Sequence, residues 1–282
     1  MKEFAHAFGE KKNLIGVVSQ PDPAQRRRGA PALIVANVGV NHRVGPVRLY
    51  VYLTRALAAR GYTCLRFDLS GLGDSEQAGS TLADGERWVE DSRAAMKLLE
   101  EHYGAKGFVL LGLCSGVDTV HSTTLADPRV LGATFVDGYA YPTPWFHVRR
   151  LARRAVDVPA WKLFLSRWLP RLFRGPLETP WLKDAPEVFV RPVVLREQFI
   201  SDLAKMLERG VRLLYVYTGG FKRRYSYSDQ FHHMVRPLET RGKVDVEIHP
   251  RADHLFSVER DRNHLIHRVS DWMLERFPGE AG

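Results

Sequence analysis

The chain has 282 residues, of which 45% are apolar and 26% charged, and it carries a net charge of +9. This composition is typical of one large folded α/β domain, and two cysteines are too few for a disulfide framework. No run approaches the roughly 18 apolar residues of a membrane span, and residues 1–12 lack the apolar segment of a secretory signal, so we expect a cytoplasmic protein.

Strands and helices are predicted to alternate up to residue 137. Strands are expected at 13–18, 32–37, 62–69, 108–114 and just before 137, and helices at about 46–60, 84–103 and 115–125. Cys64 lies inside one of these apolar strands, and we interpret it as a buried small apolar residue. The alternation predicts an α/β class with a mostly parallel central sheet flanked by helices.

The alternation is interrupted between Tyr141 and Arg196. This segment holds four of the six tryptophans and eleven Lys/Arg against four Asp/Glu. Within it, 159–172 has the spacing of a basic amphipathic helix, which would also suit contact with an anionic membrane surface. After it, helices are expected near 197–209 and 262–277, and strands at 211–217 and 243–249. We therefore predict a core of 1–140 and 197–282 interrupted by an inserted helical lid at 141–196.

The strongest motif is G-L-C-S-G at 112–116, between a buried strand and a helix. A nucleophile elbow turns so sharply that it needs small residues two before and two after the nucleophile, and Gly112 and Gly116 hold those places around Cys114. The helix N-terminus there favours a thiolate. The alternatives are a structural Cys114 beside a helix-capping Ser115, and Ser115 as the nucleophile, which Leu113 and Val117 would crowd.

A nucleophile needs a base, and His254 is the best placed histidine. It follows the last predicted strand, where a loop brings an imidazole back over the carboxyl edge of the sheet. His249 lies within that strand, and His121 lies on the elbow helix, where packing or capping would explain it. The orienting acid is expected after strand 211–217, but T-G-G-F-K-R-R there contains no carboxylate. Asp137, at the end of the preceding strand, is favoured over Asp229.

Acyl transfer also requires two N–H donors for the developing oxyanion. The backbone of Ser115 would supply one, and Gly39 or Val38, in the loop after strand 32–37, would supply the other. Three side chains of the same loop are candidates for holding a substrate carboxylate or phosphate, although a solvated loop is the simpler interpretation. They are His42, Arg43 and Arg48.

Together these landmarks resemble the α/β-hydrolase superfamily over nearly the whole chain. F-D-L-S-G-L-G-D-S at 67–75 is similar to the family's F-D-x-R-G-x-G-x-S loop, with Ser70 where arginine is usual, and 136–141 and 252–256 also fall at family landmarks. The chain also resembles bacterial hydrolases associated with exosortase and exopolysaccharide gene clusters, some of which carry a G-x-C-x-G elbow. Dienelactone hydrolases are a second such group. The resemblance implies a lid after the sixth core strand.

A thiolate attacks esters and thioesters to give an acyl-cysteine intermediate. We therefore expect an acyl hydrolase, a thioesterase or esterase, whose substrate an acidic acyl carrier protein or coenzyme A could present to the basic insertion. The alternatives are an acyltransferase that passes the acyl group to an amine or alcohol, and a non-catalytic binding module. A dinucleotide site at G-L-G-D-S-E (71–76) is weaker, since the third glycine is missing. We expect no cofactor, no metal and no nucleic-acid partner.

Overall fold

An eight-stranded sheet forms the centre of the protein, seen here in a computed structural model that describes residues 1–77, 79, 81–156 and 194–280. The strand order is β1-β2-β4-β3-β5-β6-β7-β8. β2 runs antiparallel to both of its neighbours, and all other neighbouring pairs are parallel. The mostly parallel sheet predicted from the alternation is therefore confirmed.

The strands have the following bounds: β1 Lys2–Phe8, β2 Leu14–Gln20, β3 Ala32–Val35, β4 Cys64–Phe67, β5 Phe108–Leu113, β6 Val130–Val136, β7 Arg212–Thr218 and β8 Val244–His249. β3, β4 and β5 are buried along their whole length, as expected of parallel strands covered on both faces. Cys64, the first residue of β4, is a free and fully buried thiol, as predicted, and burial raises its pKa.

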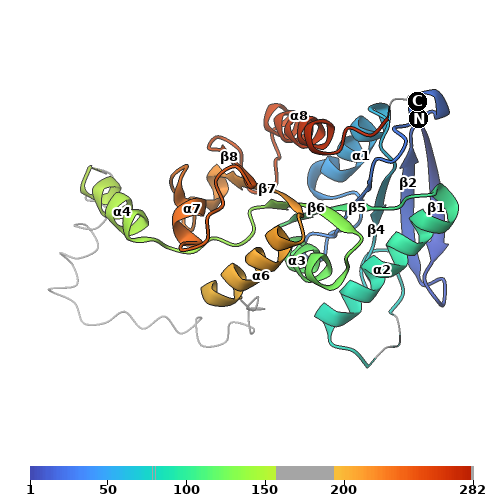
Figure 1. Cartoon of the computed structure of the whole chain (residues 1–282), viewed down its shortest axis with the longest axis horizontal. Coiled ribbons are helices and arrows are strands. Elements are labelled where there is room, and N and C mark those ends of the chain that lie inside the picture. The colour runs from blue at the N-terminus through green and yellow to red at the C-terminus, as the bar shows by residue number, and fades with distance from the viewer. Residues whose placement is uncertain (78, 80, 157–193, 281–282) are drawn as a thin grey trace, which may run out of the picture.

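The α-helices are α1 Leu49–Ala59, α2 Asp84–Tyr103, α3 Gly116–Ala126, α4 Pro144–Val156, α6 Arg196–Glu208, α7 Gln230–Met234 and α8 Glu259–Arg276. Helices α1 and α8 cover one face of the sheet, and α2, α3 and α6 cover the other (Figure 1). Each layer encloses its own apolar core against the sheet. Among the described residues, no helix combines the length and apolar content needed to cross a bilayer.

The expected helix 46–60 differs at its start. Residues Pro46–Arg48 form a 3₁₀ turn, in which Val47 and Arg48 have left-handed backbone angles, and α1 begins only at Leu49. The strand β1 is an element that the sequence patterns did not indicate. It lies at the edge of the sheet and is largely exposed, so it lacks the apolar run that marks the central strands.

The predicted insertion 141–196 is described only at its two ends. Of its residues, 157–193 lie outside the described part of the chain, and these include the whole amphipathic stretch 159–172. At its N-terminal end, α4 projects away from the layers on the side where α7 lies (Figure 1). The lid and the division of the chain into 1–140, 141–196 and 197–282 therefore stay predictions.

Candidate active site

The turn between β5 and α3 holds Cys114 at its apex, where the backbone is left-handed with φ of 55°. The chain closes so tightly here that a Cβ on Gly112 would lie 2.4 Å from the carbonyl oxygen of Gly116. A Cβ on Gly116 would lie equally close, 2.4 Å, to the carbonyl oxygen of Asn37. A side chain at either position would clash with a backbone carbonyl, so both positions require glycine. The strained turn leaves Cys114 partly exposed at the carboxyl edge of the sheet, next to the N-terminus of α3.

Two further side chains reach this edge from the ends of other elements. His254 lies in the loop between β8 and α8, and its Nδ1 is 2.7 Å from Oδ2 of Asp137, the residue that follows β6. The imidazole also forms a side-chain hydrogen bond with Cys114. The structure thus brings together Cys114, His254 and Asp137, which lie far apart in the sequence.

Asp137 is completely buried and its backbone is left-handed, with φ of 48°. Its carboxylate accepts hydrogen bonds from the backbone N–H and the hydroxyl of Thr218, the last residue of β7. The N–H bond is 2.7 Å long. Thr218 occupies the place where an acid was expected, and there it orients the acid that comes from the neighbouring strand. This role was not predicted from the sequence, although the hydroxyl side chain at the strand end was a signal for it.

The pKa of His254 is raised to about 10, mainly by the hydrogen bond to the carboxylate of Asp137. Contact with Cys114 also raises this pKa, whereas partial burial lowers it. The imidazole is therefore protonated at neutral pH. A cation beside a cysteine favours its thiolate form. The site thus places a protonated imidazole next to the Cys114 side chain, and a buried carboxylate holds that imidazole in place.

The other candidates for base and acid lie elsewhere. Asp229 precedes α7, is half-exposed and forms an ion pair with Arg241 at 3.2 Å. His121 is buried, and its Nε2 lies 3.1 Å from Asp202. His249 contacts Glu247 at 2.7 Å. The geometry thus favours Asp137 over Asp229 as the partner of His254.

The loop after β3 approaches the elbow as expected, but one predicted donor is engaged. The N–H of Gly39 donates a 2.6 Å hydrogen bond to the hydroxyl of Ser115. Val38 is buried beside it. Ser115 lies at the N-terminus of α3, where backbone N–H groups have no acceptor within the helix. The Ser115 hydroxyl is therefore a polar atom at the predicted oxyanion site that the sequence analysis did not assign.

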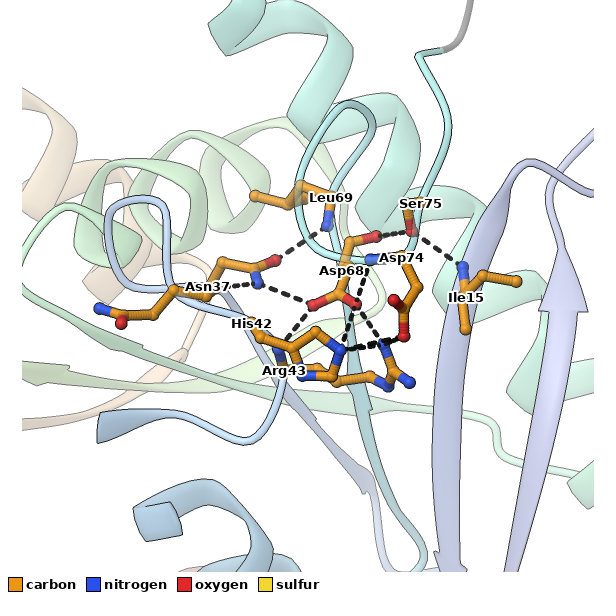
Figure 2. A network of polar contacts seen from close by, with 9 residues as sticks. Ile15, Asn37, His42, Arg43, Asp68, Leu69, Asp74 and Ser75 are labelled. Carbon is orange, nitrogen blue, oxygen red and sulfur yellow. Dashed lines mark hydrogen bonds and ion pairs between the residues drawn. The ribbon is translucent and has the colours of Figure 1, made fainter. Parts of the chain in front are cut away.

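A polar network fixes this loop to the one after β4, and Figure 2 shows it. At its centre lies the buried carboxylate of Asp68, which forms an ion pair with the guanidinium of Arg43 and accepts the Arg43 backbone N–H at 2.6 Å. Asn37 donates its side-chain amide to Asp68 at 3.2 Å and accepts the backbone N–H of Leu69 at 2.8 Å (Figure 2). Asp74 also contacts Arg43, at 2.7 Å.

These contacts give His42, Arg43 and Arg48 partners within the chain, whereas the expectation that they hold a substrate anion stays a prediction. The charge of Arg43 is neutralised by two aspartates, and His42 lies 3.0 Å from one of them, Asp74. Arg48 directly precedes α1, and its guanidinium lies over the ring of Tyr52. In the described structure the first two side chains brace the loop, and the sequence could not reveal their partners because those lie in the separate loop after β4.

The same network fills the glycine-rich turn 71–76. A Cβ on Gly73 would lie 2.4 Å from the carboxylate of Asp68, so that side chain occupies the inside of the turn. A phosphate cradle needs this space and free backbone N–H groups. In this chain the Asp74 N–H donates to Asp68 at 3.1 Å. The turn thus holds its own acid, which disfavours the dinucleotide interpretation.

The residues after β7 form a basic rim next to His254. Phe221 stacks on the imidazole with ring centres 6.4 Å apart and planes inclined by 12°. Lys222, Arg223 and Arg224 follow it, are exposed and make no ion pair with an acid among the described residues. The guanidinium of Arg224 lies over the ring of Phe221, at 5.9 Å, so this cation is next to the residue that stacks on His254.

The chain matches one known protein family and is similar to several solved structures. The family model for serine aminopeptidase, S33, matches residues 32–193. No curated protein matches the chain. An esterase of Pyrococcus furiosus superposes with a TM-score of 0.58 at 15% identity, over 99% of this chain and 93% of that one.

Two other solved structures show the same likeness. The esterase domain of a Rhodothermus marinus protein gives a TM-score of 0.56 at 19% identity, over 99% of both chains. A putative α/β hydrolase from Agrobacterium tumefaciens gives 0.57 at 16% identity, over 99% of this chain and 98% of that one. At these identities the structures show the fold alone, which is the α/β-hydrolase fold.

Proposed function

The chain belongs to the serine aminopeptidase S33 family of α/β hydrolases, and we propose that it is an acyl hydrolase that works through an acyl-cysteine intermediate on Cys114. The observation that carries the proposal is the chain of contacts from Cys114 through His254 to the buried Asp137 at the carboxyl edge of the sheet. The proposal departs from the serine nucleophile of the family's name, because a cysteine occupies the apex of the elbow.

The reaction follows from the charges of the resting site. The Cys114 thiolate attacks the carbonyl carbon of an ester or thioester, and an S–C bond forms while the carbonyl oxygen becomes an oxyanion. When the oxyanion collapses, the bond to the leaving alcohol or thiol breaks, and His254 donates its proton to that group. Neutral His254 then takes a proton from water, which attacks the acyl-cysteine and releases the acid and the thiolate. Asp137 holds the imidazole in one orientation throughout.

The oxyanion would meet donors from both sides of the elbow. The backbone N–H of Ser115 lies on the helix side, and the loop of Val38 and Gly39 lies on the other. Because the Ser115 hydroxyl accepts the Gly39 N–H, its own proton is free to point elsewhere, and it can be donated to the oxyanion. The hydrogen bond from Gly39 polarises the Ser115 hydroxyl, which makes its proton a better donor to the oxyanion.

The basic rim favours a thioester carried on an anionic group. Lys222, Arg223 and Arg224 directly follow the residues that pack on His254, so an anionic leaving group bound at the elbow would meet positive charge. Coenzyme A and the phosphopantetheine arm of an acyl carrier protein both carry phosphate next to the thiol arm. A CoA thioester is therefore the substrate that we propose for testing.

The decisive experiment pairs Cys114→Ala with Ser115→Ala. Removing the thiol should abolish hydrolysis of acyl-CoA substrates, whereas removing the hydroxyl should cost no more than about tenfold in kcat, the value of one hydrogen bond of about 1.4 kcal/mol. Intact-mass measurement after mixing with acyl-CoA should show an acyl adduct that Cys114→Ala lacks.

Three results would contradict the proposal. They are full activity of Cys114→Ala, loss of all activity in Ser115→Ala with the adduct gone, and a wild-type protein that neither turns over nor is acylated by any of a panel of thioesters and esters. The last result would favour the binding module. Product analysis with added amines or alcohols identifies the acceptor, because acyl transfer would consume the same adduct without releasing acid.

A further inference from the structure

The strand β8 and the helix α8 are joined by a ladder of polar side chains on the outer edge of the sheet. Every second residue of the strand faces every fourth residue of the helix, and the two steps match because they advance by about 6.7 Å and 6 Å. The strand contributes Asp245, Glu247 and His249, and the helix contributes His264, Arg268, Trp272 and Arg276. Nothing in the proposed acyl chemistry uses this ladder.

One rung of the ladder gathers two imidazoles around a single carboxylate oxygen. Oε1 of Glu247 lies 2.7 Å from Nε2 of His249 and 3.1 Å from Nε2 of His264. The three ligand atoms all lie within 4.8 Å of one another. Two imidazole nitrogens and one carboxylate oxygen are ligands that Zn²⁺ binds at about 2.0–2.2 Å.

We propose that Glu247, His249 and His264 bind a divalent transition-metal ion of the Zn²⁺ type, which clamps β8 to α8. The ion would enter between atoms that already converge, so only small side-chain movements are required. A mixed set of imidazole and carboxylate ligands selects borderline cations over Mg²⁺ and Ca²⁺, which prefer oxygen alone.

Two of the three ligands are already held in position. The other carboxylate oxygen of Glu247, Oε2, lies 2.5 Å from Nε of Arg268, which fixes the carboxylate and leaves Oε1 for the ion. The His249 side chain is only 4% exposed, and its ring meets those of Phe256 and His264 edge to face. Its Nδ1 is buried with no hydrogen-bond partner, so all polar compensation for burying this ring comes through Nε2.

The third ligand gives the site its access from solvent. The His264 side chain is 62% exposed, so an ion can arrive from solution and keep a water in its fourth position. His249 is the last residue of β8, and its carbonyl accepts the N–H of Ala252 at 3.1 Å in the turn that leads to His254. A bound ion would therefore fasten the root of that loop without touching the reacting atoms.

The second cluster of potential ligands in the described residues does not compete as a site. His42, Asp68 and Asp74 also converge, but the guanidinium of Arg43 lies among them and binds both aspartates. A cation there would have to displace a charge of the same sign. The ladder site has its arginine on the far oxygen of the carboxylate instead.

The test uses a Cys114→Ala background, so that the active-site thiol cannot bind the metal. After treatment with EDTA and its removal, ZnCl₂ is titrated into the protein by calorimetry, and the thermal midpoint is measured with and without Zn²⁺. His264→Gln is compared with His267→Gln, because both residues are exposed histidines of the same helix and only the first belongs to the cluster.

We expect one Zn²⁺ to bind per chain and to raise the midpoint in the Cys114→Ala protein and in His267→Gln. His264→Gln should bind Zn²⁺ at least tenfold more weakly and lose the rise in midpoint. MgCl₂ should leave every midpoint unchanged. The proposal is overturned by a protein that binds no Zn²⁺, by equal binding in the two histidine variants, or by an equal effect of Mg²⁺. Because the readouts are binding and stability, they are independent of whether the acyl chemistry is correct.

Discussion

At the scale of single residues, the site depends on Asp137. Its carboxylate is buried, accepts two hydrogen bonds from Thr218 and contacts His254 at 2.7 Å. This contact is the largest cause of the raised pKa of His254, about 10. An imidazolium that lasts to such a pH can protonate a leaving group over the whole neutral range.

Asp137→Asn should therefore move the alkaline limb of the pH profile. In the wild type, kcat/KM should fall only as pH rises through about 10, where His254 loses its proton. Without the carboxylate the pKa of His254 falls, so the same limb should appear at lower pH, and kcat/KM at pH 7.5 should drop by about a hundredfold. Steady-state rates from pH 6 to 10.5 measure both effects.

The matched control is Asp253→Asn, next to His254 in sequence. Asp253 accepts the N–H of Leu255 at 2.8 Å, within its own loop, so its loss should leave the limb in place. An unmoved limb in Asp137→Asn would show that this carboxylate does not set the protonation of His254.

The residue scale also shows how much of the site the sequence could predict. Cys114 and His254 were predicted from local signals, a glycine frame and a position after a strand, and the structure brings the two together. The choice of Asp137 over Asp229 was only a preference, since each acid follows a strand after which the orienting acid of this fold can lie. The roles of Thr218 and of the Ser115 hydroxyl were missed because each depends on a partner more than 70 residues away in the sequence.

At the scale of elements, the loop after β3 is held by the loop after β4. Asp68 is the shared anchor, with contacts to Arg43, Asn37 and the backbone of Asp74 (Figure 2). The family-like F-D-x-x-G motif therefore has a physical reason in this chain. Its aspartate braces the loop that carries Gly39 opposite the elbow.

Asp68→Asn should loosen this loop and leave the elbow intact. An amide cannot neutralise Arg43, so we expect a loss of about 1.5–3 kcal/mol in the free energy of unfolding, the value of hydrogen bonds to a charged group. Because Gly39 then lies less firmly opposite Ser115, kcat should fall, whereas alkylation of Cys114 by iodoacetamide should keep its rate. Denaturant unfolding and alkylation kinetics give the two readouts.

Asp74→Asn is the control, since the side chain of Asp74 is 59% exposed and the substitution affects only its outer contacts to Arg43 and His42. It should be nearly as stable as the wild type. Equal stability of the two variants would show that Asp68 does not anchor the loop.

At the scale of the whole molecule, the net charge of +9 should attract an anionic substrate. Part of that charge lies on Lys222, Arg223 and Arg224, which directly follow Phe221, the residue that stacks on His254. Salt should screen the attraction, because the Debye length falls from about 10 Å at 0.1 M to about 3 Å at 1 M.

KM for an acyl-CoA should consequently rise several-fold between 0.05 and 0.5 M NaCl, whereas KM for the uncharged N-acetylcysteamine thioester of the same acid should stay constant. Arg223→Gln should flatten the salt response. Arg212→Gln, at the opposite end of β7, should not. An equal salt response for the two thioesters would show that the rim does not recognise the carrier.

The sequence by itself determined the alternation of strands and helices, the elbow around Cys114 and the position of His254 after the last strand. These features are local, since apolar runs, glycine spacing and strand ends are properties of short segments. Only the tertiary structure decided which acid orients His254, that Arg43 is a brace, that β1 joins the sheet edge, and that Glu247, His249 and His264 converge. Each of these depends on strand order and on contacts between distant segments, because the folded sheet brings together strand ends that the sequence separates.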